Sequence, residues 1–381
     1  AFKDCSGLQS IQFNKNVKKI GAHSFENCHN LKTISTIDAE EICDFAFIYC
    51  GNLLSEIKFG DKLKKIGKFA FAFCGQLYGD LIIPNSVTSL GTNIFQECFG
   101  FNGTLSLSSN ITLIPDYCFF SCGNLNGNLK IPESIELIGD YSFFMNNRFS
   151  GNLIIPNKVK SIGISAFWGN SGFTGDLNLP ESVISIENSA FFLCQGLNGQ
   201  LHIPSKLTCI KEYAFSDCLN LHGSLILPES ITAIKANAFQ NCFELSGPLI
   251  IPNKVKSIGH GAFCFCVKLN GSLIIPDSVE NIENNAFVYC SGFNGELKLP
   301  SELKLIESYV FRNCSKLSGS LNIPNSVQII ENYAFYNCIN FNESLIFNDS
   351  VEKIGAFCFA NCYGFKNDLK LPTNLKTIEK H

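Results

Sequence analysis

The chain has 381 residues, of which 46% are hydrophobic and 16% charged, with a net charge of -4 and a pI near 5.9. This much apolar material is enough for a large core and excludes a largely disordered chain. The acidic balance argues against nucleic acid or another polyanion as a partner. No apolar run approaches the roughly 20 residues that span a bilayer, so we expect no membrane span in this segment.

A phenylalanine recurs along the whole chain. From Phe47 onward every step is 24 residues, and the two earliest steps are 23 and 22 residues. The series is Phe2, Phe25, Phe47, Phe71, Phe95, Phe119, Phe143, Phe167, Phe191, Phe215, Phe239, Phe263, Phe287, Phe311, Phe335 and Phe359. A constant period of this size predicts a solenoid. We expect one continuous domain over residues 1–381 with about 16 coils, one for each of these "spine" phenylalanines. The chain begins and ends inside the motif, which indicates a segment of a longer protein.

Each coil predicts a sequence of short elements. The L-x-I alternation, as at Leu273 and Ile275, puts two side chains on one face of a short parallel strand. Pro276 ends that strand and begins a corner, because proline cannot donate a ladder hydrogen bond. The V-x-x-I segment, as at Val279 and Ile282, predicts a second extended or turn segment. The spacing in A-F-x-x-C then predicts a short helical turn.

The motif resembles the BspA-like class of leucine-rich repeat. The shorter family form is matched by "CSGLQSIQF" (Cys5–Phe13), and "LYGDLII" (Leu77–Ile83) is similar to BspA-like surface antigens of trichomonads. The resemblance implies a right-handed leucine-rich repeat solenoid with short parallel strands and short helical turns. It also implies an adhesin at the cell surface or outside the cell that binds host matrix, host cells or other microbes. It transfers no catalytic residue to this chain.

Most cysteines occupy one repeat position. Fourteen of the 19 lie three residues after a spine phenylalanine, and two coils carry Asn146 and Asn170 there instead. Thiol and carboxamide share a compact size and the ability to hydrogen-bond to backbone, so we expect a buried ladder of thiols. Disulfides between neighbouring coils are the alternative, because stacked Cα atoms near 5 Å fall within disulfide range. A single column of cysteines supplies no tetrahedral arrangement for zinc, so no metal site is expected.

The sequence predicts no enzyme and no cofactor. The six histidines occupy unrelated repeat positions, so stacking assembles no catalytic constellation. Glutamates that follow the proline, such as Glu181 and Glu229, alternate with Ser205 and Asn253, which is typical of solvated turns. The periodic single glycines form no phosphate-binding loop.

The outward residue of the L-x-I segment varies while the inward residues stay constant, as expected of a display scaffold. Ile226, Ile250 and Ile274 occupy this position in three consecutive coils, and His202 and Lys298 flank them. We call Ile226, Ile250 and Ile274 the isoleucine stripe and predict that it is a ligand-binding site with a polar rim. The competing interpretation is that isoleucine simply suits a strand.

Two classes of function follow. The first is a non-enzymatic binding scaffold, an adhesin that contacts a protein or glycan on another surface through its strand face. The second is a structural protein that self-assembles end to end or laterally.

Overall fold

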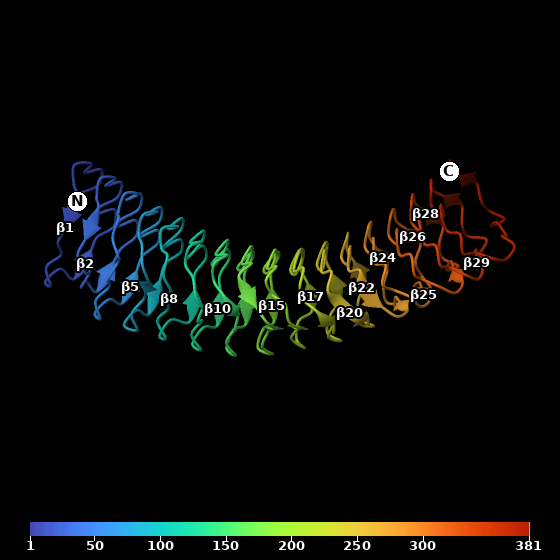
Figure 1. The fold of residues 1–381 in the computed structure, drawn as a ribbon, viewed down its shortest axis with the longest axis horizontal. Helices are drawn as coiled ribbons and strands as arrows, with labels where there is room; N and C mark the ends of the chain where they lie inside the picture. Colours follow the sequence, from blue (N-terminus) through green and yellow to red (C-terminus); the bar gives the residue numbers. More distant parts are fainter. Residues whose placement is uncertain (381) are drawn as a thin grey trace. The chain divides into compact units, whose positions relative to one another are not determined.

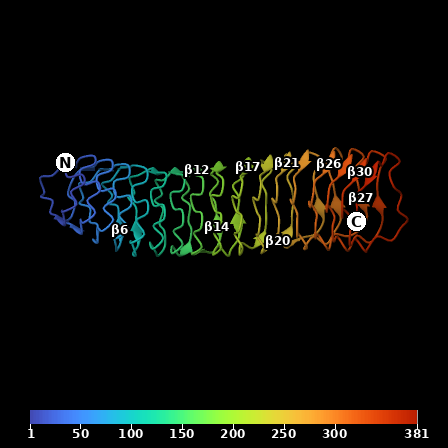
Figure 2. The ribbon, with the colours of Figure 1, turned by 90° about the horizontal axis from the view of Figure 1, so that it is seen from above.

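The computed structural model describes residues 1–380 and contains no helix among them. The chain divides into two compact units, Ala1–Leu197 (unit 1) and Asn198–His381 (unit 2), each described by itself. Figures 1 and 2 show that each unit is a row of coils lying side by side. Parallel strands of neighbouring coils pair 24 residues apart, as Leu137 with Ser161, or 22 in an early coil, as Lys19 with Glu41. The predicted leucine-rich repeat solenoid is confirmed. The single continuous domain stays a prediction.

The longest parallel ladders lie at the V-x-x-I segment, where each strand ends at its Ile or Leu. Since β-branched residues fit a half-buried pleated surface, isoleucine at this position favours the ladder. Unit 1 has two four-stranded sheets of this kind: β2 (Lys19–Ile20), β4 (Glu41–Ile42), β5 (Lys65–Ile66) and β7 (Ser89–Leu90), then β9 (Leu113–Ile114), β10 (Leu137–Ile138), β12 (Ser161–Ile162) and β15 (Ser185–Ile186). Unit 2 has two more: β17 (Cys209–Ile210), β19 (Ala233–Ile234), β21 (Ser257–Ile258) and β24 (Asn281–Ile282), then β26 (Leu305–Ile306), β28 (Ile329–Ile330), β30 (Lys353–Ile354) and β31 (Thr377–Ile378).

The strand predicted at L-x-I forms in several coils. These strands are β6 (Leu81–Ile82), β8 (Leu105–Ser106) and β14 (Leu177–Asn178) in unit 1, and β16 (Leu201–His202), β23 (Leu273–Ile274), β25 (Leu297–Lys298), β27 (Leu321–Asn322) and β29 (Leu345–Ile346) in unit 2. The prediction is wrong for the coils of Ile226 and Ile250, which have no strand at that position.

Those coils pair through residues slightly earlier in the repeat. Their strands are β18 (Gly223–Ser224), β20 (Leu245–Pro248) and β22 (Lys268–Asn270), and the corresponding strands of unit 1 are β1 (Ser10–Ile11), β3 (Thr33–Ile34), β11 (Gly151–Asn152) and β13 (Phe173–Thr174). In β20 the last residue is Pro248, which has no N–H with which to extend the ladder into Leu249.

The helical turn predicted at A-F-x-x-C is wrong. The residues two before and two after the spine phenylalanine adopt positive φ, for example Tyr141 (φ 53°) and Met145 (φ 57°) around Phe143. Such left-handed residues interrupt any right-handed helix, so the segment is a series of tight turns.

Hydrogen bonds between coils explain this backbone. The N–H groups of Tyr141, Phe143 and Met145 donate to carbonyl oxygens of the next coil at 2.7, 2.9 and 2.8 Å. A helix would direct these N–H groups along its own axis, toward carbonyls four residues earlier. Left-handed residues cost roughly 1–3 kcal/mol each, and the bonds between coils offset that cost.

The spine phenylalanines form the centre of the core in each unit. Phe143 is fully buried, and its ring stacks on Phe119 at 5.5 Å and on Phe167 at 5.4 Å between centroids. The sequence prediction of a buried phenylalanine row is confirmed. It makes each coil dependent on the coils before and after it.

The cysteine position has the backbone role inferred from its exchange with asparagine. The thiol of Cys98 donates to the carbonyl oxygen of Phe71, a spine residue of the preceding coil, at 3.0 Å. Asn146 and Asn170 donate through Nδ2 to the corresponding carbonyls of Phe119 and Phe143, both at 2.8 Å. Residues 1–380 contain no disulfide.

We expect that Phe143→Ala will lower the free energy of unfolding by about 3–5 kcal/mol, because it leaves a cavity in a close-packed ring stack. Urea unfolding of a fragment containing unit 1 measures this value. Phe99→Ala is the control, because Phe99 is exposed. Equal losses for the two variants would contradict the central role of the spine.

We expect that Asn146→Cys will stabilise the protein by about 1 kcal/mol. A cysteine keeps a donor for the Phe119 carbonyl and removes the Asn146 Oδ1, which is buried without a hydrogen-bond partner. Asn146→Ala should destabilise it, since the carbonyl then loses its donor. The test is the urea midpoint under reducing conditions, and a less stable Asn146→Cys variant would count against this account.

Burial raises the pKa of Cys98 and of Cys194 to about 12. An unfolded chain ionises these thiols at lower pH than the folded chain does, so it loses more protons as the pH rises. Their stabilising contribution is therefore complete below about pH 9, the model thiol pKa, and is lost toward pH 12. Urea midpoints followed from neutral to alkaline pH should fall in that window. A Cys98→Ala variant should show a smaller decline than the parent chain.

Candidate functional site

The isoleucine stripe lies on the surface of unit 2. Ile226, Ile250 and Ile274 are 73%, 69% and 54% exposed. The leucines and isoleucines on either side of them in sequence, such as Leu225 and Leu227, are buried. The in-and-out alternation inferred from L-x-I therefore holds even where no regular strand forms.

The polar residues predicted to flank the stripe are also exposed. His202 ends β16 and Lys298 ends β25, and each follows a buried leucine in its coil. Lys298 is the direct cross-strand partner of Ile274 in the pairing of β23 with β25. Directly paired residues of this kind have neighbouring side chains, so Lys298 adjoins the stripe.

A shallow hollow of about 650 Å³ lies over part of the stripe. Its lining includes Ile250, Ile274 and Lys298, with Pro248 between coils and the acidic residues Glu229 and Asp277. The structure therefore brings three of the five predicted residues together in one hollow. Ile226 and His202 are exposed on the same repeat position but do not line it.

Sequence reasoning missed the acidic residues of this hollow. Glu229 and Asp277 follow a proline and were interpreted as solvated turn residues. Asp277 Oδ1 accepts a hydrogen bond from the Ser301 N–H at 2.7 Å. The Ser301 hydrogen bond, with the nearby charge of Lys298, lowers the pKa of the Asp277 carboxyl group. The available signal was the period, since both acidic residues stand two positions after an inward residue of the stripe coils.

A second hollow, of about 840 Å³, lies on the other side of Lys298. It is lined by Glu296, Glu302, Asn322, Glu343 and Ile346 together with Lys298. The strand face of unit 2 thus changes from an apolar hollow to an acidic one, with one lysine lining both. Such a surface can contact a macromolecule through apolar packing and charge pairing, whereas small-molecule sites are usually more enclosed.

The described part of the chain, residues 1–380, holds no group of three or more His, Cys, Asp or Glu side chains arranged for a metal ion. Its cysteine thiols are shielded where they are buried. For example, burial raises the pKa of Cys264 to about 11. Over the same residues, no helix is long and apolar enough to cross a membrane.

These features define a leucine-rich repeat protein built of parallel-strand coils. The chain belongs to the family described as the BspA type leucine rich repeat region, whose six-copy profile matches residues 1–102, 40–174, 170–294 and 293–381. As a member of this family the chain is a repeat scaffold of the protein-binding kind. The comparison with curated proteins found no match.

Solved structures support the fold. A leucine-rich repeat protein from Bacteroides ovatus is 24% identical, with a TM-score of 0.62, over 93% of this chain and 85% of that one. A leucine rich cell surface protein from Faecalibacterium prausnitzii is 25% identical, with a TM-score of 0.37, over 94% of this chain and 78% of that one. The pneumococcal vaccine antigen PcpA is 18% identical, with a TM-score of 0.45, over 86% of this chain and 85% of that one.

Proposed function

We propose that this chain is a non-enzymatic adhesin, displayed at the cell surface or secreted, that contacts a protein or glycan on another surface. The observation that carries the proposal is the isoleucine stripe, three consecutive coils that expose an isoleucine between buried residues. The hollow over Ile250 and Ile274, with charged residues at its edge, supports a contact of mixed apolar and polar character.

The size of the stripe indicates weak individual contacts. Burying a whole isoleucine contributes about 1.5–3 kcal/mol, so three partly exposed isoleucines contribute several kcal/mol. Association costs at least about 4 kcal/mol in lost translational and rotational freedom. One stripe therefore gives low affinity, and many copies displayed on one surface raise it through multivalency. Adhesion between surfaces fits this energetic balance.

Replacing Ile226, Ile250 and Ile274 together by lysine should abolish adhesion with little change in stability, since the exposed side chains contribute little to the core. Ile250→Lys should weaken adhesion by itself. The measurement is retention of beads coated with the purified chain on cultured epithelial cells. Circular dichroism and thermal unfolding confirm the fold of each variant.

Ile82→Lys is the matched control, because Ile82 occupies the same repeat position in unit 1, is exposed, and has Ser106 as its cross-strand partner. It should leave adhesion unchanged. Unaltered adhesion by a folded triple variant would eliminate the stripe as the contact site. Loss of adhesion in the Ile82 control would indicate a general charge effect.

Self-assembly is the alternative use of an exposed apolar stripe. Light scattering over a concentration series separates the two functions. A monomer at every concentration excludes assembly of this chain, whereas association that the triple lysine variant abolishes would favour the structural function.

A further inference from the structure

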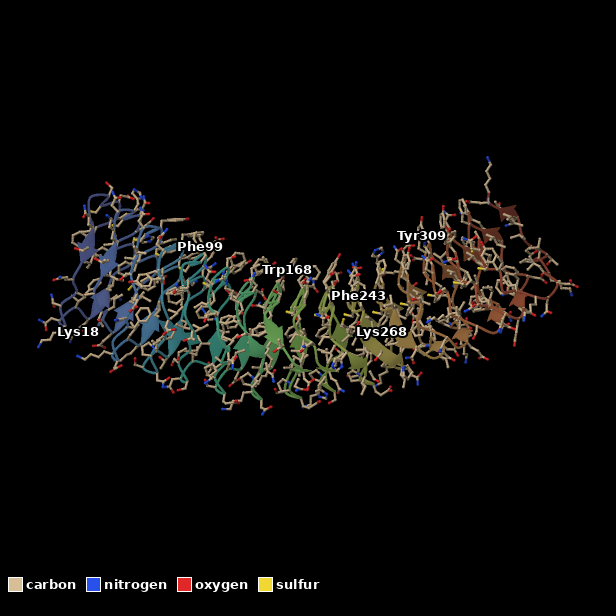
Figure 3. All side chains as sticks on the ribbon, in the orientation of Figure 1. Lys18, Phe99, Trp168, Phe243, Lys268 and Tyr309 are labelled. Carbon is tan, nitrogen blue, oxygen red and sulfur yellow. The ribbon has the colours of Figure 1, made fainter. Side chains whose placement is uncertain are left out.

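A cluster of aromatic side chains surrounds Arg312 on the turn segments of unit 2. The central guanidinium carbon lies 5.5 Å from the ring centroid of Tyr309, 5.9 Å from that of Tyr333 and 5.4 Å from that of Tyr336. Tyr309 and Tyr333 stack at 5.0 Å. All four residues are half-buried, and Figure 3 shows Tyr309 at an edge of unit 2.

The positive charge of Arg312 has no acidic partner among residues 1–380. Its Nε is buried without any hydrogen-bond partner. Acidic residues of the same coils are engaged elsewhere: Glu307 accepts the Asn284 N–H, and Glu331 pairs with Lys353 at 3.6 Å. The guanidinium is thus stabilised by the tyrosine rings and keeps its capacity to bind an anion.

The cluster is held by the repeat backbone. Tyr309 and Tyr333 have positive φ, and their N–H groups donate to Asn332 and Ala356 of the following coils at 3.0 and 2.9 Å. The rings in turn restrict the Arg312 side chain. Because these groups are already ordered, a ligand would lose little affinity to side-chain ordering.

We propose that Arg312, Tyr309, Tyr333 and Tyr336 form a binding site for a sugar that carries a carboxylate. A planar guanidinium binds a carboxylate through two parallel hydrogen bonds. Within the described chain no residue hydrogen-bonds the three phenolic hydroxyls, which can both donate to and accept from sugar hydroxyls.

The number of charges favours a ligand with one anionic group. Arg312 is the one cation placed against these rings, and the chain carries a net charge of -4. A polyanion such as a heavily sulfated chain needs a broad basic surface, so a single acidic sugar unit is the better match. This site lies on the turn segments, and it does not depend on the proposed adhesive function of the isoleucine stripe.

The test is titration of the whole chain with 3′-sialyllactose and with lactose by saturation-transfer NMR and calorimetry. The two probes differ in the acidic sugar, so we expect binding of 3′-sialyllactose and at least about tenfold weaker binding of lactose. Raising the ionic strength should weaken the binding.

Arg312→Gln should weaken binding about tenfold or more, and Tyr336→Phe about threefold, because the second change removes one hydroxyl and keeps the ring. Arg148→Gln is the control, because Arg148 is the other arginine of the chain, is exposed and lies in unit 1. If Arg312→Gln fails to fold, Tyr336→Phe decides the outcome.

Several results would overturn the proposal: no binding of 3′-sialyllactose, equal binding of lactose, or full binding by both folded variants. A peptide with a free carboxyl terminus that binds as tightly as 3′-sialyllactose would show a carboxylate site without sugar selectivity and would overturn the assignment to a sugar.

Discussion

The hydrogen bonds that link each turn segment to the next coil constrain the rest of the structure. They require alternate N–H groups around the spine phenylalanine to face the following coil, as at Tyr141, Phe143 and Met145. This requirement imposes positive φ on the flanking residues and directs the phenylalanine ring inward. It also leaves the phenylalanine carbonyl to accept from the thiol or carboxamide one coil later, as Phe119 accepts from Asn146. Backbone pairing, ring stacking and the cysteine ladder are therefore one connected system.

This system confines sequence variation to outward positions. Ile274 and Lys298 are direct cross-strand partners, yet one is apolar and the other charged, while the leucines before them are both buried. Neither outward side chain takes part in the ring stack or the thiol ladder. A coil can thus change its surface chemistry without changing the interactions that hold it to its neighbours, which separates recognition from stability.

The sequence predicted what depends on the period and on residue exchange. The 24-residue step identified Phe143 as core, and Asn146 in a cysteine position revealed the backbone bond. It misplaced the regular ladder and predicted helical turns, because the spacing of Ala, Phe and Cys suits a helix and a chain of left-handed turns alike. Local spacing does not contain the bonds to the next coil that decide between them. Glu229 and Asp277 were dismissed because their position varies from coil to coil, whereas a hollow depends on which coils are adjacent.

Two stretches of each coil reach the surface of unit 2 with different chemistry. The residue within L-x-I displays Ile274, and the residue after the spine phenylalanine displays Arg312 among tyrosines. Between these stretches every coil inserts buried residues, including Cys314 and Leu317. Substitutions at distant sites without shared partners have additive effects, so changes on one stretch should not alter the other. A protein built this way can acquire or lose a binding feature one coil at a time, on either stretch, while the bonds between its coils stay the same.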